Sequence, residues 1–295
     1  MGTLSKILFP VEFSLRCQGA TRYVEALARQ FHSEVILLHV VPAVTIPYGT
    51  PPVLAYSGAT ELDAERTEDR RKRLNQFLAG EFEGISVRRV LLHNGDPAER
   101  IVTEAAREGC GLIVIPTHGY GPFRRFLLGS VTAKVLHDAK CPVWTGPHLE
   151  EAGERNSEPV RFGKILCAVD RTEDNLEAAH WAARFAADCG ASLSLVHVLP
   201  ITIVRMGGVS FNPEWRANIV REARAWMCQL QSQIGISSEP LVEIGEVPAT
   251  VDAAARDFGA DLLVIGRGRP HGIHGRLRTN AYAILRQAPC PVAAV

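Results

Sequence analysis

The chain has 295 residues, 46% of them hydrophobic, and its 32 basic side chains equal its 32 acidic ones. That length is typical of two domains that each bury a core of their own. The balanced charge excludes a protein-wide attraction to nucleic acid or to anionic lipid, so neither is expected as a partner.

The hydrophobic runs are short, whereas a membrane-spanning helix needs about 20 apolar residues, so no membrane partner is expected. A strand-like run begins at Ile7, which leaves no room for a signal peptide. We therefore expect a cytoplasmic protein.

In the first half of the chain, apolar runs alternate with helical patterns, as in a parallel sheet that is buried on both faces. Strands are predicted at residues 6–11, 35–41, 85–92, 112–116 and 142–145. Helices are predicted at residues 18–30, 59–79, 97–107 and 131–136. This alternation indicates an α/β fold.

One of these helices has clear start and stop signals. Asp96 can cap free N–H groups, Pro97 fits a first turn, and Glu99 holds the reciprocal capping position. Gly109 is a typical residue for the position after the last turn. The helix is therefore expected to lie between Asp96 and Gly109.

The second half repeats this order. Strands are predicted at residues 165–170, 194–199, 240–244, 262–265 and 291–295, and helices at 174–189, 214–234, 248–258 and 279–287. The polar segment between the halves, bounded by Pro147 and Pro159, is the predicted linker. The domains are accordingly expected at residues 1–147 and 163–295, with the linker at 148–162.

Short segments of the first half also return in the second half in the same order, which indicates a duplicated domain. The matching pairs are Lys6–Glu12 with Lys164–Asp170, Leu37–Pro42 with Leu195–Pro200, and Ala139–Val143 with Ala288–Val292. His39 and His197 stand at matching places in apolar strands, and we interpret both as structural histidines.

The loop after the fourth predicted strand contains glycines and ends where a helix is expected to begin. In open parallel sheets, ligands bind beyond the carboxyl ends of the strands. Gly119 and Gly129 would let backbone N–H groups approach an anion, and Ser130, just before the helix, offers a hydroxyl. This chemistry suits a phosphate. A plain glycine-rich turn with Ser130 as the N-cap explains the same residues, and the sequence leaves both interpretations open.

Together these segments resemble the universal stress protein (UspA) superfamily, in a tandem two-domain arrangement. The resemblance is carried by Lys6–Val11, the strand end His39-Val40, Thr117-His118-Gly119, Gly129-Ser130 and Cys141-Pro142-Val143. It implies two tandem Rossmann-like (adenine nucleotide alpha hydrolase-like) domains, each an open five-stranded parallel sheet flanked by helices. It also implies that the two final strands, Cys141–Thr145 and Cys290–Val295, meet between the halves.

The resemblance further implies a nucleotide site in the first half. Members of the ATP-binding branch hold phosphates with Gly-x-x-Gly and a later Gly-Ser/Thr, and adenosine with an Asp after strand one and a Val at the end of strand two. Gly119, Gly129 and Ser130 match the phosphate positions, and Val40 matches the valine. His118 is expected to contact phosphate or to clamp the loop.

This half departs from the family pattern at two positions. Glu12 stands in place of the Asp, which keeps the carboxylate but moves it outward by one methylene. Pro116 stands in place of the first glycine, and proline has no N–H to donate. The first half is therefore expected to hold an impaired ATP site.

In the second half, Asp170 and Val198 match the adenosine positions, but the phosphate loop differs. Gly268 matches Gly119 and Thr279 takes the place of Ser130, whereas Arg278 replaces the glycine before it. The loop is rich in arginine, and guanidinium groups can bind phosphate through their side chains. A solvated basic loop, or one that faces acidic residues of a partner, explains these arginines equally well.

The leading hypothesis is a stress-response regulatory protein that binds ATP or a related adenine nucleotide, with or without Mg²⁺, mainly in the first half. The alternative is a nucleotide-independent interaction or scaffold protein with degenerate sites, which Pro116 and Arg278 favour. A second alternative is a slow ATPase with His118 or Glu12 as the base.

The sequence contains no recognisable hydrolase motif and no set of metal ligands, so enzymatic activity and a metal centre are not expected. The expected partners are an adenine nucleotide and, within the chain, the other domain. A homodimer and an unidentified protein partner remain open.

Overall fold

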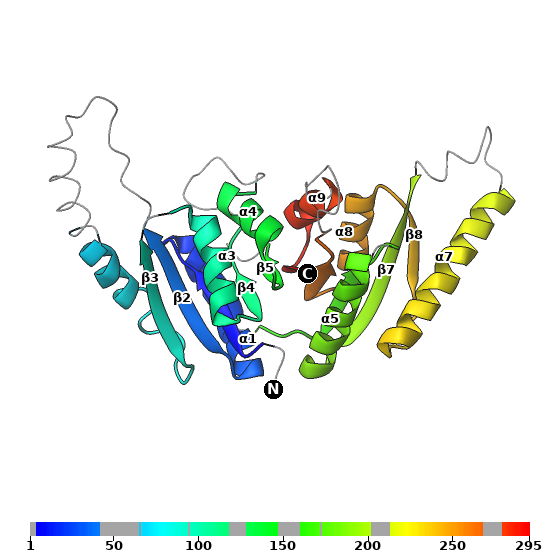
Figure 1. The fold of residues 1–295 in the computed structure, drawn as a ribbon. Helices are drawn as coiled ribbons and strands as arrows, with labels where there is room; N and C mark the ends of the chain where they lie inside the picture. The colour runs from blue at the N-terminus through cyan, green and yellow to red at the C-terminus, as the bar shows by residue number, and fades with distance from the viewer. Residues whose placement is uncertain are drawn as a thin grey trace, which may run out of the picture.

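The computed structural model describes residues 4–41, 65, 67–93, 95–117, 128–146, 160–171, 173–201, 213–267 and 279–295. Within these ranges, strands and helices alternate along both halves (Figure 1). The α/β class predicted from the sequence is confirmed, and the observed elements begin and end close to the predicted residues.

The first half contains β1 (Lys6–Pro10), α1 (Leu15–Phe31), β2 (Glu34–Val41), β3 (Val87–His93), α3 (Pro97–Glu108), β4 (Leu112–Val114), α4 (Ser130–Asp138) and β5 (Val143–Thr145). Residues 67–76 are also helical. The second half contains β6 (Lys164–Ala168), α5 (Glu173–Cys189), β7 (Ser192–Pro200), α7 (Pro213–Ile234), β8 (Leu241–Gly245), α8 (Val247–Phe258), β9 (Leu262–Ile265), α9 (Thr279–Gln287) and β10 (Val292–Ala294).

The strands form a single ten-stranded sheet in the order β3-β2-β1-β4-β5-β10-β9-β6-β7-β8. Within each half, all five strands run parallel, which is the Rossmann-like arrangement expected from the resemblance. The halves join where β5 pairs with β10 in the antiparallel direction, with Trp144 opposite Ala293. The prediction that the two final strands meet is confirmed by this pairing.

Helices cover both faces of the sheet because its strands are apolar on both sides. The core on one face contains buried side chains of α1, α5 and α7, and the core on the other face contains side chains of α3, α4, α8 and α9. Each core includes residues from both halves, so the junction between the halves is itself buried.

An aromatic cluster fills this junction on the α1 and α5 face. Trp144 of β5 is fully buried, and its ring centroid lies 5.4 Å from that of Phe162 and 5.8 Å from that of Phe185. Phe185 also contacts Phe31 of the first half, with 5.3 Å between ring centroids. Rings from both halves therefore share one packed cluster, which adds aromatic contacts to the burial of apolar area.

The Asp96 and Gly109 signals of α3 are observed as predicted. The carboxylate of Asp96 accepts a hydrogen bond of 3.0 Å from the backbone N–H of Glu99, and Gly109 ends the helix with a φ of 64°. The start of α4 differs from the prediction. Gly129 is the N-cap and Ser130 is the first residue of the helix, so the interpretation of Ser130 as the N-cap is wrong.

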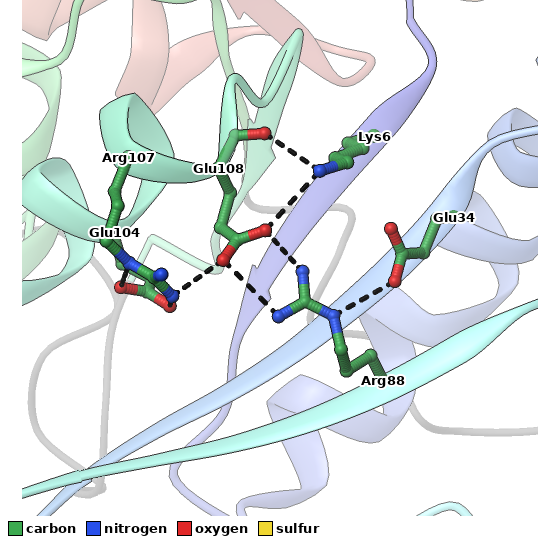
Figure 2. Close-up of polar contacts among 6 residues, drawn as sticks. All are labelled: Lys6, Glu34, Arg88, Glu104, Arg107 and Glu108. Atoms are coloured by element: carbon green, nitrogen blue, oxygen red, sulfur yellow. Dashed lines mark hydrogen bonds and ion pairs between the residues drawn. The ribbon is translucent and has the colours of Figure 1, made fainter.

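A network of ion pairs crosses the first half at the amino ends of its strands (Figure 2). Arg88 of β3 donates hydrogen bonds to Glu108 at the end of α3 and, at 3.0 Å, to Glu34 at the start of β2. Lys6 of β1 lies 3.4 Å from the Glu108 carboxylate. These pairs link three strands to a helix, on the edge of the sheet opposite to the carboxyl ends of the strands.

The network predicts a pH-dependent contribution to stability. Hydrogen bonds from Arg88 lower the pKa of Glu108, so the stabilisation should be complete above the ordinary pKa of a glutamate, about 4.3. It should be lost as the pH falls through the lower folded-state pKa. Glu108→Gln should therefore lower the urea midpoint more at pH 7 than at pH 3. The control, Glu99→Gln, alters an exposed side chain at the other end of α3 and should have a smaller effect at pH 7. Equal losses for Glu108→Gln at both pH values would contradict the prediction.

Candidate functional site

The structure contains a cavity of about 530 Å³ in the second half, at the carboxyl ends of β6, β7 and β9. Helices α7, α8 and α9 supply its remaining walls. The edge of a parallel sheet at its strand ends is where the sequence predicted a ligand. The size is within the range of about 300–1,000 Å³ that is usual for small-molecule sites.

Two residues that the resemblance assigned to adenosine line this cavity. Ala168 of β6 pairs with Val196 of β7, so Asp170 and Val198, each two positions further, lie at the same edge of the sheet. Both line the cavity, and Val198 is buried. The structure thus brings together the two predicted positions beside an open space.

Apolar side chains form most of the cavity wall, with polar groups among them. Two carboxylates, those of Asp170 and Glu222, line it together with the guanidinium of Arg171 and the amide of Asn280. The guanidinium carbon of Arg171 lies 5.7 Å from the centroid of the Trp226 ring. The arrangement suits a ligand with a flat apolar part and hydrogen-bond donors, because carboxylates accept hydrogen bonds from amines and hydroxyls.

Strand register shows which residues of the two phosphate loops correspond. Ile113 of β4 pairs with β1, and Leu263 of β9 pairs with β6 at the equivalent position of the second half. Counting onward from these residues places Gly266 at the position of Pro116. Gly266 lines the cavity, so the second half has a glycine where the first half has a proline without an N–H.

His197 at this edge is held by the backbone, as is His39 in the first half. The Nδ1 atom of His197 lies 2.8 Å from the carbonyl oxygen of Val169, and that of His39 lies 2.7 Å from the carbonyl oxygen of Val11. A carbonyl only accepts, so both Nδ1 atoms carry the proton. Burial lowers the pKa of each ring, which keeps both neutral. The backbone hydrogen bond expected of a structural histidine is therefore present at both positions.

In the first half, Glu12 and Val40 lie at the matching edge. Pro10 pairs with Leu38, and Glu12 and Val40 each follow two positions later. The Glu12 carboxylate accepts a hydrogen bond of 3.1 Å from the hydroxyl of Ser14, which also caps α1. The longer acidic side chain therefore has a partner at the start of a helix.

The start of α4 is tied to the end of β4 at two points. The N–H of Gly129 donates to the carbonyl of Thr117 over 2.8 Å, and the hydroxyl of Thr132 donates to the carbonyl of Pro116 over 2.9 Å. No side chain caps α4, and Ser130 is exposed on its first turn. A helix start of this kind presents backbone N–H groups and partial positive charge.

Three of the predicted site residues, His118, Gly119 and Gly268, lie outside the described residues, as does Arg278. Thr279 is the first residue of α9, at the place that Ser130 occupies in α4.

Two features at this edge were not predicted. One is the cavity, whose walls come from helices far apart in the sequence. The other is the direction of Arg267, the one arginine of the basic loop within the described ranges. Its guanidinium donates to the carbonyls of Ala139, over 2.7 Å, and Leu136, over 3.4 Å, at the end of α4 in the first half.

No helix in the described ranges is both long and apolar enough to cross a membrane.

The chain matches known proteins in sequence. The model of a family described as the universal stress protein family matches residues 3–145 and again residues 161–295. Universal stress protein A homolog 1 of Coxiella burnetii is 32% identical over 140 residues, which are 46% of this chain and 97% of that protein. Universal stress protein MJ0577 of Methanocaldococcus jannaschii is 31% identical over 149 residues, which are 47% of this chain and 91% of that protein.

Solved structures match over both halves. A universal stress protein from Archaeoglobus fulgidus superposes with a TM-score of 0.68 at 20% identity, covering 99% of this chain and 97% of that one. A putative universal stress protein from Pseudomonas aeruginosa gives a TM-score of 0.64 at 20% identity, with 99% and 93% coverage. At this identity the likeness shows a shared fold, including the tandem arrangement.

Proposed function

Because the chain belongs to the universal stress protein family, which both of its halves match, we propose that it is a stress-response regulator that binds an adenine nucleotide. One observation carries the proposal. The cavity at the carboxyl ends of β6 and β7 is lined by Asp170 and Val198, the residues that the family resemblance assigns to adenosine. Its apolar walls suit a base, and its carboxylates suit amine and hydroxyl donors.

The first half contributes a second position for the nucleotide. Gly129 begins α4 without a side-chain cap, so the N–H groups of the first turn face outward beside the Ser130 hydroxyl. A phosphate is stabilised by such a helix start. Glu12 and Val40 stand at the adenosine positions of this half. The resemblance placed the main site here, whereas the cavity supports the second half for the nucleoside. Both positions therefore belong to the proposal.

The test is a calorimetric titration of nucleotide-stripped protein with ATP and Mg²⁺. Wild-type protein should bind ATP, Asp170→Ala should remove binding in the second half, and Gly129→Arg should remove it in the first. The second substitution copies Arg278 into the first half. The double variant should give no heat of binding. The substitution that removes more of the signal lies in the half with the stronger site.

Absence of binding by the wild-type protein would contradict the proposal. That result would favour a nucleotide-independent interaction protein, for which Pro116 is the specific observation. A proline at the end of β4 offers no N–H to a phosphate, and its carbonyl is already engaged by Thr132.

A further inference from the structure

Arg267 makes a contact between the halves that the duplicated architecture does not require. It follows Gly266, which lines the cavity of the second half, and its backbone N–H donates to the carbonyl of Val295 over 2.9 Å. Its side chain crosses the junction to the carbonyls of Ala139 and Leu136. One residue is thus connected both to the edge of the second-half cavity and to α4 of the first half.

The contact satisfies the end of a short helix. The last carbonyls of an α-helix have no partner within the helix, and they carry partial negative charge. α4 has nine residues, about two and a half turns, so loss of order in its last turn would affect much of its length. The guanidinium of Arg267 supplies both hydrogen-bond donors and a positive charge at this end.

The opposite end of the same helix is the proposed phosphate position of the first half. Gly129 and Ser130 form that end, and the Gly129 N–H and the Thr132 hydroxyl fix it to the end of β4 by donating to the carbonyls of Thr117 and Pro116. An anion at the start of a helix and a cation at its end interact favourably with the same aligned peptide dipoles. Holding the end of α4 in place therefore also orders its start.

In the described part of the first half, the residue that matches Arg267 is not an arginine. Strand register places Thr117 at the position of Arg267, and a threonine has no guanidinium.

We propose that Arg267 is a positioning residue for the phosphate site of the first half, acting from the second half through α4. The inference rests on the proposed function, because it concerns nucleotide binding at Gly129 and Ser130. It assigns to the second half a role in the ligand affinity of the first half, in addition to its own cavity.

The test is carried out on the full chain with Asp170→Ala, so that the first half is the site measured. In that background, Arg267→Gln should weaken ATP binding about three- to tenfold, as expected for a charge at a helix end. Arg267→Lys, which keeps the cation, should recover part of the loss. Adenosine has no phosphate, so its affinity should stay the same in both variants. Calorimetry with ATP and with adenosine gives the two affinities.

The matched control is Arg256→Gln, which removes a guanidinium of the second half that pairs with Asp252 of its own helix at 3.2 Å. It should leave both affinities unchanged. An unchanged ATP affinity in Arg267→Gln, or an equal loss for ATP and adenosine, would overturn the inference alone. ATP binding by wild-type protein but not by the Asp170→Ala background would also overturn it, while the proposed function stands. No binding by wild-type protein would overturn both.

Discussion

Trp144→Ala is expected to destabilise the protein by about 3–5 kcal/mol, the usual cost of removing a fully buried large aromatic side chain. Its larger effect should be on cooperativity. Trp144 contacts Phe162 and Phe185 at the junction, where the cores of the two halves are continuous. We expect the wild-type protein to unfold in one transition and the variant to unfold in two. In the variant, the contact energy between the halves should no longer exceed the difference between the stabilities of the two halves.

The measurement is urea denaturation, monitored by hydrogen exchange at β1 and at β6. These two strands report separately on the two halves. Leu74→Ala is the control. Leu74 is buried in the helical segment 67–76 beside the far strand of the sheet, and the substitution should cost about 2–5 kcal/mol without separating the two transitions. A Trp144→Ala protein that still unfolds in a single transition would show that the remaining contacts between the halves, the β5–β10 pairing among them, are sufficient to couple the halves.

Ala281→Phe should abolish binding of the nucleoside in the second half, with an affinity loss of at least about 100-fold, or ~2.7 kcal/mol. Ala281 is a small side chain of α9 that lines the cavity opposite the strand ends. A phenyl ring at this position would occupy the space that the proposed base requires. Ala281 is itself buried, so the larger ring should also lower stability by about 1–3 kcal/mol where it meets packed neighbours.

ATP titration of the Gly129→Arg background isolates this site, because that substitution should remove ATP binding from the first half, and thermal unfolding of the same samples checks the fold. Ala281→Thr is the matched control, since threonine is the residue at the corresponding position 132 of the first half. It should retain most of the affinity. An ATP affinity in Ala281→Phe equal to that of the Gly129→Arg background would show that the ligand binds somewhere other than this cavity.

The fold was predictable because its signals are local or repeated. Apolar runs such as Val35–Val41 are long enough to fix a buried strand, and Asp96 and Gly109 mark the ends of α3 by their own chemistry. The start of α4 was misplaced by one residue. A glycine and a serine both serve as N-caps, and only the backbone path from Thr117 decides between them.

The candidate site was predictable in part for the same reason. Asp170 and Val198 are set by position along two strands, so their meeting follows from strand register. The cavity beside them was not predictable, because it depends on how α7, α8 and α9 pack. The contact made by the Arg267 side chain was also not predictable from the sequence. An arginine in a basic loop indicates anion binding, and only the tertiary structure shows that its guanidinium contacts carbonyls of α4.

The antiparallel pairing of β5 with β10 has a consequence for how the two halves can change. Two identical chains that met at this junction would carry every substitution twice, once on each side. Here both sides belong to one polypeptide, so a residue can change on one side alone. Arg267 stands at the position in the second half that Thr117 has in the first, and Gly266 stands at the position of Pro116. Covalent linkage therefore frees each half to specialise, and dilution does not separate a pair that is joined within one chain.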